Sequence, residues 1–324
     1  MEADPGPAAS AAGRMNIWVL TDGKIGDEIQ CLAVARALGG SVEKRVVAPR
    51  APWVWMSALG AIDPRERRGV AQGPISGTPP DLVIASGRRV VPYAQAVKKA
   101  SGGRTRLVYL KDPRAGRNAA DVIWAPAHDR LSGANAFSTL TSPHDLSARI
   151  AARRAAPGAA VAALSKPLLG VVLGGGGGYG AEEAAAFADR LNVAGADYAA
   201  IAVTPSRRTP SAFMEALRER LRHPHVYIWD GKSENPYVDI LAQSDALIVG
   251  ADSHNMISEA VAAGVGVYAY RPPGLAKKLA WFVNQLEAQG AARPFEGAAP
   301  PFARAPMDAT PEIVAEIRKR LFAA

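Results

Sequence analysis

The stretch PLLGVVLGGGGGYGAEEAAAFADRL, residues 167–191, holds the pattern from which the fold of this protein can be predicted. Its first seven residues have the length and composition of a buried β-strand, five consecutive glycines follow, and an Ala-rich stretch at 181–193 predicts a helix. Glycine has no Cβ, so such a loop turns sharply and lets another group approach its backbone. Strand, glycine loop and helix in this order predict one βα unit of a parallel sheet.

The same alternation of strand and helix extends on both sides of this stretch. In the first half, strands are expected at 16–21, 41–47, 81–86, 106–110 and 121–126, with helices at about 28–38, 52–61, 89–101 and 143–154. In the second half, strands are expected at 167–173, 198–204, 225–230, 245–250 and 265–270, with helices at about 181–193, 210–222, 236–243, 254–263 and 274–289. This order predicts an α/β protein with two Rossmann-like, doubly wound domains.

The predicted domain boundaries follow shifts in composition. Residues 1–14 are expected to be a disordered extension, with Met15 as an alternative start of the native protein. Residues 15–160 form the predicted N-terminal domain and 161–305 the C-terminal one, joined through an Ala-rich linker at 151–167. A last helix within 306–324 is expected to be able to pack back on the N-terminal domain.

Composition limits the class of protein. Of 324 residues, 48% are hydrophobic and 21% charged, and the mean hydropathy is −0.01, which is typical of a soluble globular protein. One cysteine, Cys31, excludes a disulfide framework and a thiolate metal site built by this chain alone. No apolar run approaches the ~20 residues that span a bilayer. A cytoplasmic location is therefore predicted.

The net charge of +8 is unevenly distributed. Residues 1–160 hold 22 Lys and Arg against 13 Asp and Glu, and the remainder holds 16 against 17. A basic first half suits an anionic partner, although a merely solubilising surface is at least as probable. With the apolar stretch APWVWMSALGAI (51–62), it indicates peripheral attachment to the inner face of the cytoplasmic membrane. A buried helix is the favoured interpretation of that stretch.

Loops that follow strands are the candidate binding sites, because ligands of open α/β sheets lie beyond the carboxyl ends of the strands. Six residues of the first two such loops in the second half are predicted to bind a phosphate-bearing substrate. They are Gly175, Gly177 and Tyr179 of the glycine loop and Ser206, Arg207 and Arg208 of the next loop. Gly175, Gly177 and Gly180 match G-x-G-x-x-G, but five consecutive glycines satisfy almost any glycine pattern. In dinucleotide-binding proteins an acidic residue near this position binds the ribose hydroxyls of an unphosphorylated cofactor. This chain has Arg207 and Arg208 there instead, and arginines favour a phosphate.

The next two loops of the second half, WDGKSENPY (229–237) and GADSHNMISEA (250–260), carry further candidates. They are Trp229, Glu234, Asn235, Asp252, Ser253, Asn255, Ser258 and Glu259. Small polar residues at a helix N-terminus bind phosphate oxygens, and Glu259 is placed to accept hydrogen bonds from ribose hydroxyls. Helix capping is an equally good explanation of Asp252, Ser253 and Glu259, and core packing is favoured for Trp229.

The first half has its own polar loops after strands. Its candidates for binding an anionic acceptor are Gly23, Lys24, Ser86, Arg88, Lys111 and Arg114. Asp27 and His128 are the candidate general bases, although an acid in a first helical turn also simply stabilises the helix and a lone His is more often structural.

Several known chemistries have no support in the sequence. No metal-ligand spacing is present, so neither a metal nor a cofactor is predicted. G-x-S-x-G and G-x-x-x-x-G-K-[ST] are both missing, which disfavours an α/β-hydrolase and a P-loop nucleotide hydrolase. Only the net charge indicates nucleic-acid binding, so none is expected.

Several strings together resemble the elongated-mitochondria (Elm) fission family. They include TDGKIGDEIQCLAVARALG from Thr21, PDLVIASGRRVVPYA, LVYLKDPR, WAPAHD, TLTSPH, TPSRRTP, WDGKSENPY and DSHNMISEAVAAG, which ends at Gly264. The resemblance implies a GT-B glycosyltransferase-like fold, with two Rossmann-like domains facing across a cleft. DSHNMISEA is similar to the donor-binding segment of the peptidoglycan lipid-intermediate N-acetylglucosaminyltransferase. That similarity implies that Ser253 and Asn255 meet a diphosphate and Glu259 the ribose of a uridine nucleotide.

The sequence departs from this family at two points. Relatives often carry His where this chain has Asp27, which puts a base role at this position in question, and the glycine loop lacks the serine of relatives. Plant members are associated with recruiting a dynamin-related protein to mitochondria.

Three hypotheses remain open. The leading one is a metal-independent glycosyltransferase that binds a nucleoside-diphosphate sugar in its second domain and a lipid-linked or anionic acceptor in its first. A non-enzymatic adaptor with a vestigial nucleotide site is the second. An NADP-dependent oxidoreductase or sugar epimerase is the third.

Overall fold

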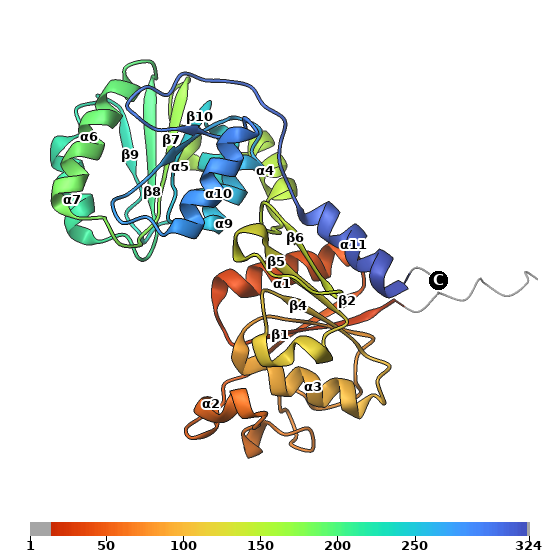
Figure 1. Ribbon diagram of the computed structural model, residues 1–324. Coiled ribbons are helices and arrows are strands. Elements are labelled where there is room, and N and C mark those ends of the chain that lie inside the picture. The colour runs from red at the N-terminus through yellow and green to blue at the C-terminus, as the bar shows by residue number, and fades with distance from the viewer. Residues whose placement is uncertain (1–13, 323–324) are drawn as a thin grey trace, which may run out of the picture. The chain divides into compact units, whose positions relative to one another are not determined.

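The computed structural model describes residues 14–322, and its internal contacts divide the chain into two compact units (Figure 1). Unit 1 comprises residues up to Trp124, Gly133–Phe137 and the chain from Val314 onward. Unit 2 comprises Ala125–Ser132 and Ser138–Ile313. Each unit is built on a six-stranded sheet, and the predicted α/β class with two doubly wound sheets is confirmed.

Unit 1 is built on a sheet with the strand order β2-β1-β3-β4-β5-β6. Its strands are β1 Asn16–Thr21, β2 Ser41–Val46, β3 Leu82–Ala85, β4 Arg106–Leu110, β5 Val122–Pro126 and β6 Ala136–Thr139. Its helices are α1 Ile25–Leu38, α2 Trp53–Met56 and α3 Val91–Ala100, with 3-10 turns η1 Ser57–Leu59, η2 Pro64–Glu66, η3 Arg88–Val90 and η4 Arg114–Ala119, whereas the turn η5 Ala127–Asp129 belongs to unit 2. β1 pairs in parallel with both β2 and β3, and its residues Ile17–Thr21 are buried.

Unit 2 has the strand order β12-β11-β10-β7-β8-β9. Its strands are β7 Leu168–Leu173, β8 Ala200–Pro205, β9 Val226–Ile228, β10 Ala246–Gly250, β11 Gly266–Tyr270 and β12 Arg293–Pro294. Its helices are α4 Leu146–Ala155, α5 Ala159–Ala162, α6 Ala181–Gly195, α7 Ser211–Arg220, α8 Tyr237–Gln243, α9 His254–Val261 and α10 Lys277–Ala288. β7 pairs in parallel with β8 and β10.

Strand β7 shows why the second sheet is buried on both faces. Successive side chains of a strand point to opposite faces. Leu168 and Val172 accordingly belong to one hydrophobic cluster, and Leu169, Val171 and Leu173 belong to the other. A parallel sheet covered by helices on both faces produces the continuous apolar run seen in the sequence.

The chain passes from one unit to the other earlier than the sequence predicts. The predicted boundary lies between 160 and 161, whereas the contacts assign residues from Ser138 onward to unit 2. The physical reason is helix α4, whose Leu146 and Ile150 are buried in the core of unit 2. The predicted linker therefore contains the end of α4 and all of α5.

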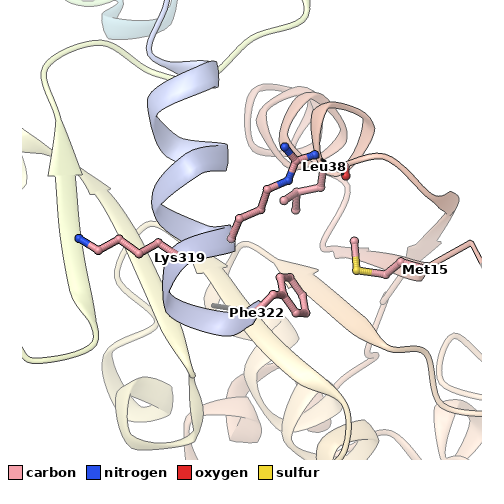
Figure 2. Close-up of a pocket in the computed structure, with 5 residues that line it drawn as sticks. Met15, Leu38, Lys319 and Phe322 are labelled. Atoms are coloured by element: carbon pink, nitrogen blue, oxygen red, sulfur yellow. Dashed lines mark hydrogen bonds between the residues drawn. The ribbon is translucent and has the colours of Figure 1, made fainter. Parts of the chain in front are cut away.

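The last helix, α11 Thr310–Phe322, begins in unit 2 and continues in unit 1 from Val314. Arg318 of α11 donates a hydrogen bond to the carbonyl of Leu38, at 3.0 Å, where α1 ends. Met15, Leu38, Arg318, Lys319 and Phe322 line a pocket of about 510 Å³ (Figure 2). The predicted extension at 1–14 lies almost wholly outside the described residues.

The segment expected to be a buried helix at 52–61 differs from that interpretation. Only Trp53–Met56 is α-helical, Ser57–Leu59 is a 3-10 turn, and no residue of α2 is buried. Within residues 14–322, no helix has both the length and the apolar composition needed to cross a membrane.

Candidate functional site

Each sheet has one point at which its strand order reverses, and ligands of open α/β sheets bind beyond the carboxyl ends of the strands at such points. In unit 1 the reversal is at β1, which lies between β2 and β3. In unit 2 it is at β7, which lies between β10 and β8. The two loops that follow β1 and β7 are therefore the first places to look for a site.

The glycine loop after β7 already holds an anion, which is the protein's own Asp252. The N–H groups of Gly175 and Gly176 donate hydrogen bonds to Asp252 Oδ2 at 2.9 and 2.7 Å, and the Tyr179 hydroxyl donates to Oδ1 at 2.7 Å. The main-chain amides that the sequence predicts to bind a phosphate therefore bind a carboxylate of the β10–α9 loop instead. This is a correction to the expected role of Gly175, and it makes Asp252 part of the loop's internal structure.

Packing explains why several positions of this loop are glycine. A Cβ on Gly174 would overlap the Asp252 carboxylate, and a Cβ on Gly175 would overlap the backbone of Arg208. Gly178 has φ +93°, and its Cβ would overlap Pro273. Gly177, by contrast, has nothing within 4 Å of its Cβ position.

The pocket in front of the glycine loop is electrostatically unsuited to phosphate. It has a volume of about 770 Å³, and residues from Gly176 to Gly180 form one of its walls. Its charged lining residues are Glu182 and Glu183, without a cationic one. A dinucleotide phosphate would meet carboxylates at this place, which argues against the NADP-dependent oxidoreductase.

The loop after β8 is attached to the glycine loop and directs two cations outward. Thr209 donates a hydrogen bond to the carbonyl of Gly174, and the N–H of Arg208 donates to Ser206 Oγ at 3.2 Å. Arg207 and Arg208 are exposed, and neither guanidinium has an ion-pair or hydrogen-bond partner within residues 14–322. Ser206 is therefore a turn residue, while the two arginines remain available to a ligand.

The N-terminus of α9 is occupied by capping and packing contacts. Ser253 is its N-cap residue and accepts from the N–H of Met256 at 3.4 Å. Ser258 is fully buried and accepts from the N–H of Ser142 at 3.0 Å. The Ser142 hydroxyl in turn lies 3.4 Å from Asn255 Oδ1. Ser258 is therefore a structural residue, contrary to its predicted role in binding.

Glu259 is the titratable group of α9 with a perturbed pKa. It is partly buried and accepts a hydrogen bond from the Tyr237 hydroxyl. Burial raises the pKa of its carboxyl group to about 7, against the opposing effects of the Tyr237 hydrogen bond and the charge of Arg149. Carboxyl groups with shifted pKa values occur often at functional sites, which supports Glu259 as a candidate.

The loop after β9 is held by internal contacts. The Trp229 indole N–H donates to the carbonyl of Ser233 at 3.2 Å. Glu234 is exposed and pairs with Arg153 at 2.6 Å, and Asn235 Oδ1 accepts from the N–H of Tyr237 at 3.0 Å where α8 begins. These three predicted binding residues all have structural roles here.

His128 belongs to unit 2, although it was expected to serve the N-terminal domain. Its ring centroid lies 4.5 Å from that of His254 and 6.0 Å from that of Phe282, and its side chain is 5% exposed. The neighbouring Asp129 pairs with Lys278 at 3.2 Å. Packing against rings of unit 2 explains both its assignment and its low exposure, and it makes His128 poorly accessible as a base.

In unit 1 the structure brings together two of the predicted site residues. Lys111, which follows β4 and has φ +74°, forms an ion pair with Asp27 in the first turn of α1. Gly23 has φ +82° and donates to Thr21 Oγ1 at 3.1 Å, so a tight turn follows β1. Lys24, Arg88 and Arg114 lie at the ends of β1, β3 and β4 with exposed side chains.

Sequence reasoning missed Asp22, the carboxylate at the switch point of unit 1. Its side chain is 2% exposed, and Lys24 Nζ lies 3.3 Å from Oδ2. Oδ1 is buried without a hydrogen-bond partner within residues 14–322, and so is the hydroxyl of Ser86 at the end of β3. Gly87, with φ +98°, allows the backbone to pass directly against this carboxylate. Its position immediately after the first strand was the available signal.

The two units together define the class of protein, a two-domain α/β protein with a GT-B-like fold. A solved structure from Listeria monocytogenes, assigned as a UDP-N-acetylglucosamine 2-epimerase, shares this fold with a TM-score of 0.57 and 13% identity, over 96% of this chain and 89% of that one. The chain belongs to the mitochondrial fission ELM1 family, whose model matches residues 25–321.

Two proteins of known sequence are similar to this chain. The mitochondrial fission protein ELM1 of Arabidopsis thaliana is 29% identical over 277 residues, which are 75% of this chain and 64% of that protein. An uncharacterized protein of Rickettsia prowazekii is 26% identical over 326 residues, 87% of this chain and 90% of that one. This chain therefore spans less than two thirds of the plant relative.

Proposed function

We propose that this protein binds a nucleoside-diphosphate sugar at the carboxyl edge of the unit 2 sheet and transfers the sugar, without a metal ion, to an acceptor bound by unit 1. The observation that carries the proposal is the pair of exposed arginines, Arg207 and Arg208, whose guanidinium groups have no partner among the described residues. They project from a turn that is attached to the glycine loop at the switch point. Two guanidinium groups at such a position suit the diphosphate of a nucleotide.

The transfer chemistry would rest on electrostatics. Negative charge develops on the leaving diphosphate as the sugar departs, and Arg207 and Arg208 would stabilise it in place of a metal ion. Glu259, when ionised, would accept hydrogen bonds from the ribose hydroxyls. Because Asp252 holds the amides of the glycine loop, these amides are left out of the proposed phosphate contacts.

The acceptor side would use the polar edge of unit 1. A hydroxyl acceptor must lose a proton, and a carboxylate within hydrogen-bond reach is the simplest base. Asp27 is held beside the ammonium of Lys111, whereas Asp22 retains a buried oxygen that has no hydrogen-bond partner in the described part of the chain. Lys24, Arg88 and Arg114 would bind the anionic part of the acceptor.

The family itself favours a second candidate, a non-enzymatic adaptor. The name of the matched family refers to mitochondrial fission, and so does the name of the Arabidopsis relative. An adaptor would keep the GT-B-like fold and bind a protein, with the nucleotide site as a relic. Fold alone does not distinguish the two, because the same fold serves many activities.

Ligand-induced thermal shifts test the proposal directly. UDP-N-acetylglucosamine is the first probe, chosen because the structurally similar Listeria protein is assigned to that substrate, followed by UDP, GDP and NADP. We expect a nucleoside diphosphate to raise the unfolding temperature, and Arg207→Gln with Arg208→Gln to weaken its binding by at least about tenfold.

Arg218→Gln is the matched control, since Arg218 is an exposed arginine on α7 of the same unit with no partner within residues 14–322. Equal affinity in the double variant and the control would refute the role of the two arginines. Stabilisation by NADP alone would refute the transferase, and no response to any nucleotide would favour the adaptor.

A further inference from the structure

Unit 1 exposes large apolar side chains on a short ridge that consists of α2 and η1. Trp55 is 77% exposed, Leu59 is 83% exposed, and Met56 between them is 38% exposed. Leu59 and Trp55 are the most exposed of the large apolar side chains in the described part of the chain. Three such side chains within five residues form a small exposed apolar patch that is not part of the buried core.

The ridge is firmly attached to unit 1, so its exposure is a property of the fold. Ser57, in the middle of the ridge, is buried and donates a hydrogen bond to the carbonyl of Trp53 at 3.1 Å. Before and after the ridge, Arg50 and Asp63 form a two-pronged ion pair, with Nε–Oδ2 at 2.9 Å and Nη2–Oδ1 at 2.7 Å. η1 also lies against α3.

The acids next to the ridge are bound to internal partners, whereas two of the nearby arginines have no side-chain partner within residues 14–322. Asp63 is bound to Arg50, and Glu66 accepts from the Tyr93 hydroxyl at 2.5 Å and from the N–H of Ala48 at 2.8 Å. Arg65 and Arg67 flank Glu66 and are exposed, and their guanidinium groups have no partner within residues 14–322.

A second pair of cations lies beside the ridge. η1 packs against η3, which carries the exposed Arg88 and Arg89, also without side-chain partners among the described residues. The net charge of unit 1 as a whole is also positive. Counted over 14–124, 133–137 and 314–324, unit 1 has 21 Lys and Arg against 10 Asp and Glu, a net charge of +11. Unit 2 has 17 against 18, a net charge of −1.

We propose that this ridge docks unit 1 on an anionic lipid bilayer, with Trp55, Met56 and Leu59 in the headgroup region and the neighbouring arginines on lipid phosphates. Tryptophan is enriched at membrane interfaces because its ring is apolar and its N–H is polar. Each arginine near an anionic leaflet adds electrostatic attraction to that leaflet. The inference does not depend on transfer activity, but it would bring the proposed acceptor edge, to which Arg88 belongs, to the membrane surface.

A bilayer suits this surface better than a folded protein partner does. A specific protein interface buries about 800 Å² on each side and has a largely apolar centre with few charges. Three apolar side chains with four nearby arginines that have no side-chain partner within residues 14–322 are too small and too charged for such a centre. They match the pairing of apolar anchors with basic residues that holds peripheral proteins on anionic lipids.

Vesicle flotation of the full chain, without any nucleotide sugar, tests this surface. We expect binding to phosphatidylcholine vesicles that contain roughly 30 mol% phosphatidylglycerol, weaker binding to phosphatidylcholine alone, and loss of binding with rising salt. Trp55→Ser with Leu59→Ser should lower the partition coefficient at least about tenfold. Arg65→Gln with Arg67→Gln should lower it mainly on the anionic vesicles. Val193→Ser is the matched control, because Val193 is 64% exposed but belongs to unit 2.

A second measurement locates the contact. Brominated lipids quench nearby tryptophans, so the vesicles should quench the wild type more strongly than Trp55→Phe. The quenching that remains in the variant should come from the partly buried Trp53 of the same ridge, because Trp18 and Trp124 are buried and Trp229 and Trp281 belong to unit 2. Wild-type protein that fails to bind anionic vesicles would overturn the proposal. So would ridge variants that keep their thermal unfolding and bind as well as the wild type. A failure here leaves the nucleotide-binding tests unaffected, and the reverse also holds.

Discussion

Replacing Asp252 by alanine should both destabilise unit 2 and create an anion site. The substitution removes the acceptor of three hydrogen bonds, from the N–H groups of Gly175 and Gly176 and from the Tyr179 hydroxyl. Burial and the nearby Asp252 raise the pKa of the Tyr179 phenol, so it stays protonated and remains a donor at neutral pH. The alanine variant therefore leaves three donors directed at an empty position.

The magnitude follows from these contacts. A hydrogen bond to a charged group contributes about 1.5–3 kcal/mol, and the three bonds share one acceptor, so their contributions do not add fully. Asp252 is also partly exposed, which allows water to replace some of the loss. We expect the free energy of unfolding to fall by about 3–4 kcal/mol.

The assay is chemical unfolding with and without sulfate or inorganic phosphate. A small anion should take the place of the carboxylate, because adjacent main-chain amides in a glycine loop bind anions. Sulfate should therefore recover part of the stability of Asp252→Ala and have a smaller effect on the wild type. Asp230→Ala is the matched control, since Asp230 also accepts from two backbone N–H groups, of Lys232 and Ser233, but in an exposed loop.

Two results would contradict this reasoning. A loss no larger than that of Asp230→Ala would show that the carboxylate does not hold the glycine loop. An equal response to sulfate in the wild type and in Asp252→Ala would show that the loop amides are not the anion site.

Two further predictions follow from the geometry. The pKa of Glu259 in the folded state is raised from its usual value to about 7. Between about pH 4.5 and 7 the native protein therefore holds a proton that the unfolded chain has released, so the free energy of unfolding should fall by up to about 2–3 kcal/mol as the pH rises through that range. Nucleotide affinity should rise over the same range as the carboxyl group ionises. Glu259→Gln should remove both effects, which pH profiles of urea unfolding and of UDP binding would measure. Profiles of the variant that equal those of the wild type would reject this role of Glu259. Gly175→Ala should destabilise the protein by about 2–4 kcal/mol because its Cβ overlaps the backbone of Arg208, whereas Gly177→Ala should be nearly neutral, and equal melting temperatures in the two variants would disprove the packing explanation.

The positions of most strands and helices follow from the sequence, and so does the α/β class. β1 and β4 have the predicted bounds, and β7 differs by one residue. These elements could be predicted because a buried parallel strand is an uninterrupted apolar run, which is a local property. The two-residue strand β12 and the short β6 were missed, since segments of this length carry no periodicity.

The candidate site is predicted less completely, because it depends on which loops the folded sheets bring together. The sequence singles out the glycine loop, the two arginines after β8 and Glu259. It gives no sign that Asp252, more than seventy residues after the glycines, fills their loop. That contact exists because β10 lies beside β7 in the sheet.

By itself, then, the sequence determined the order of the βα units, the basic character of the first half and the residue types at the strand ends. All three depend only on residues that are close together in the chain. Only the tertiary structure decided that His128 and α4 belong to unit 2, that a buried oxygen of Asp22 has no partner among residues 14–322, and that Trp55 and Leu59 face solvent. Burial and hydrogen-bond partners depend on which segments are neighbours in space, and strand order, rather than distance along the chain, sets those neighbours.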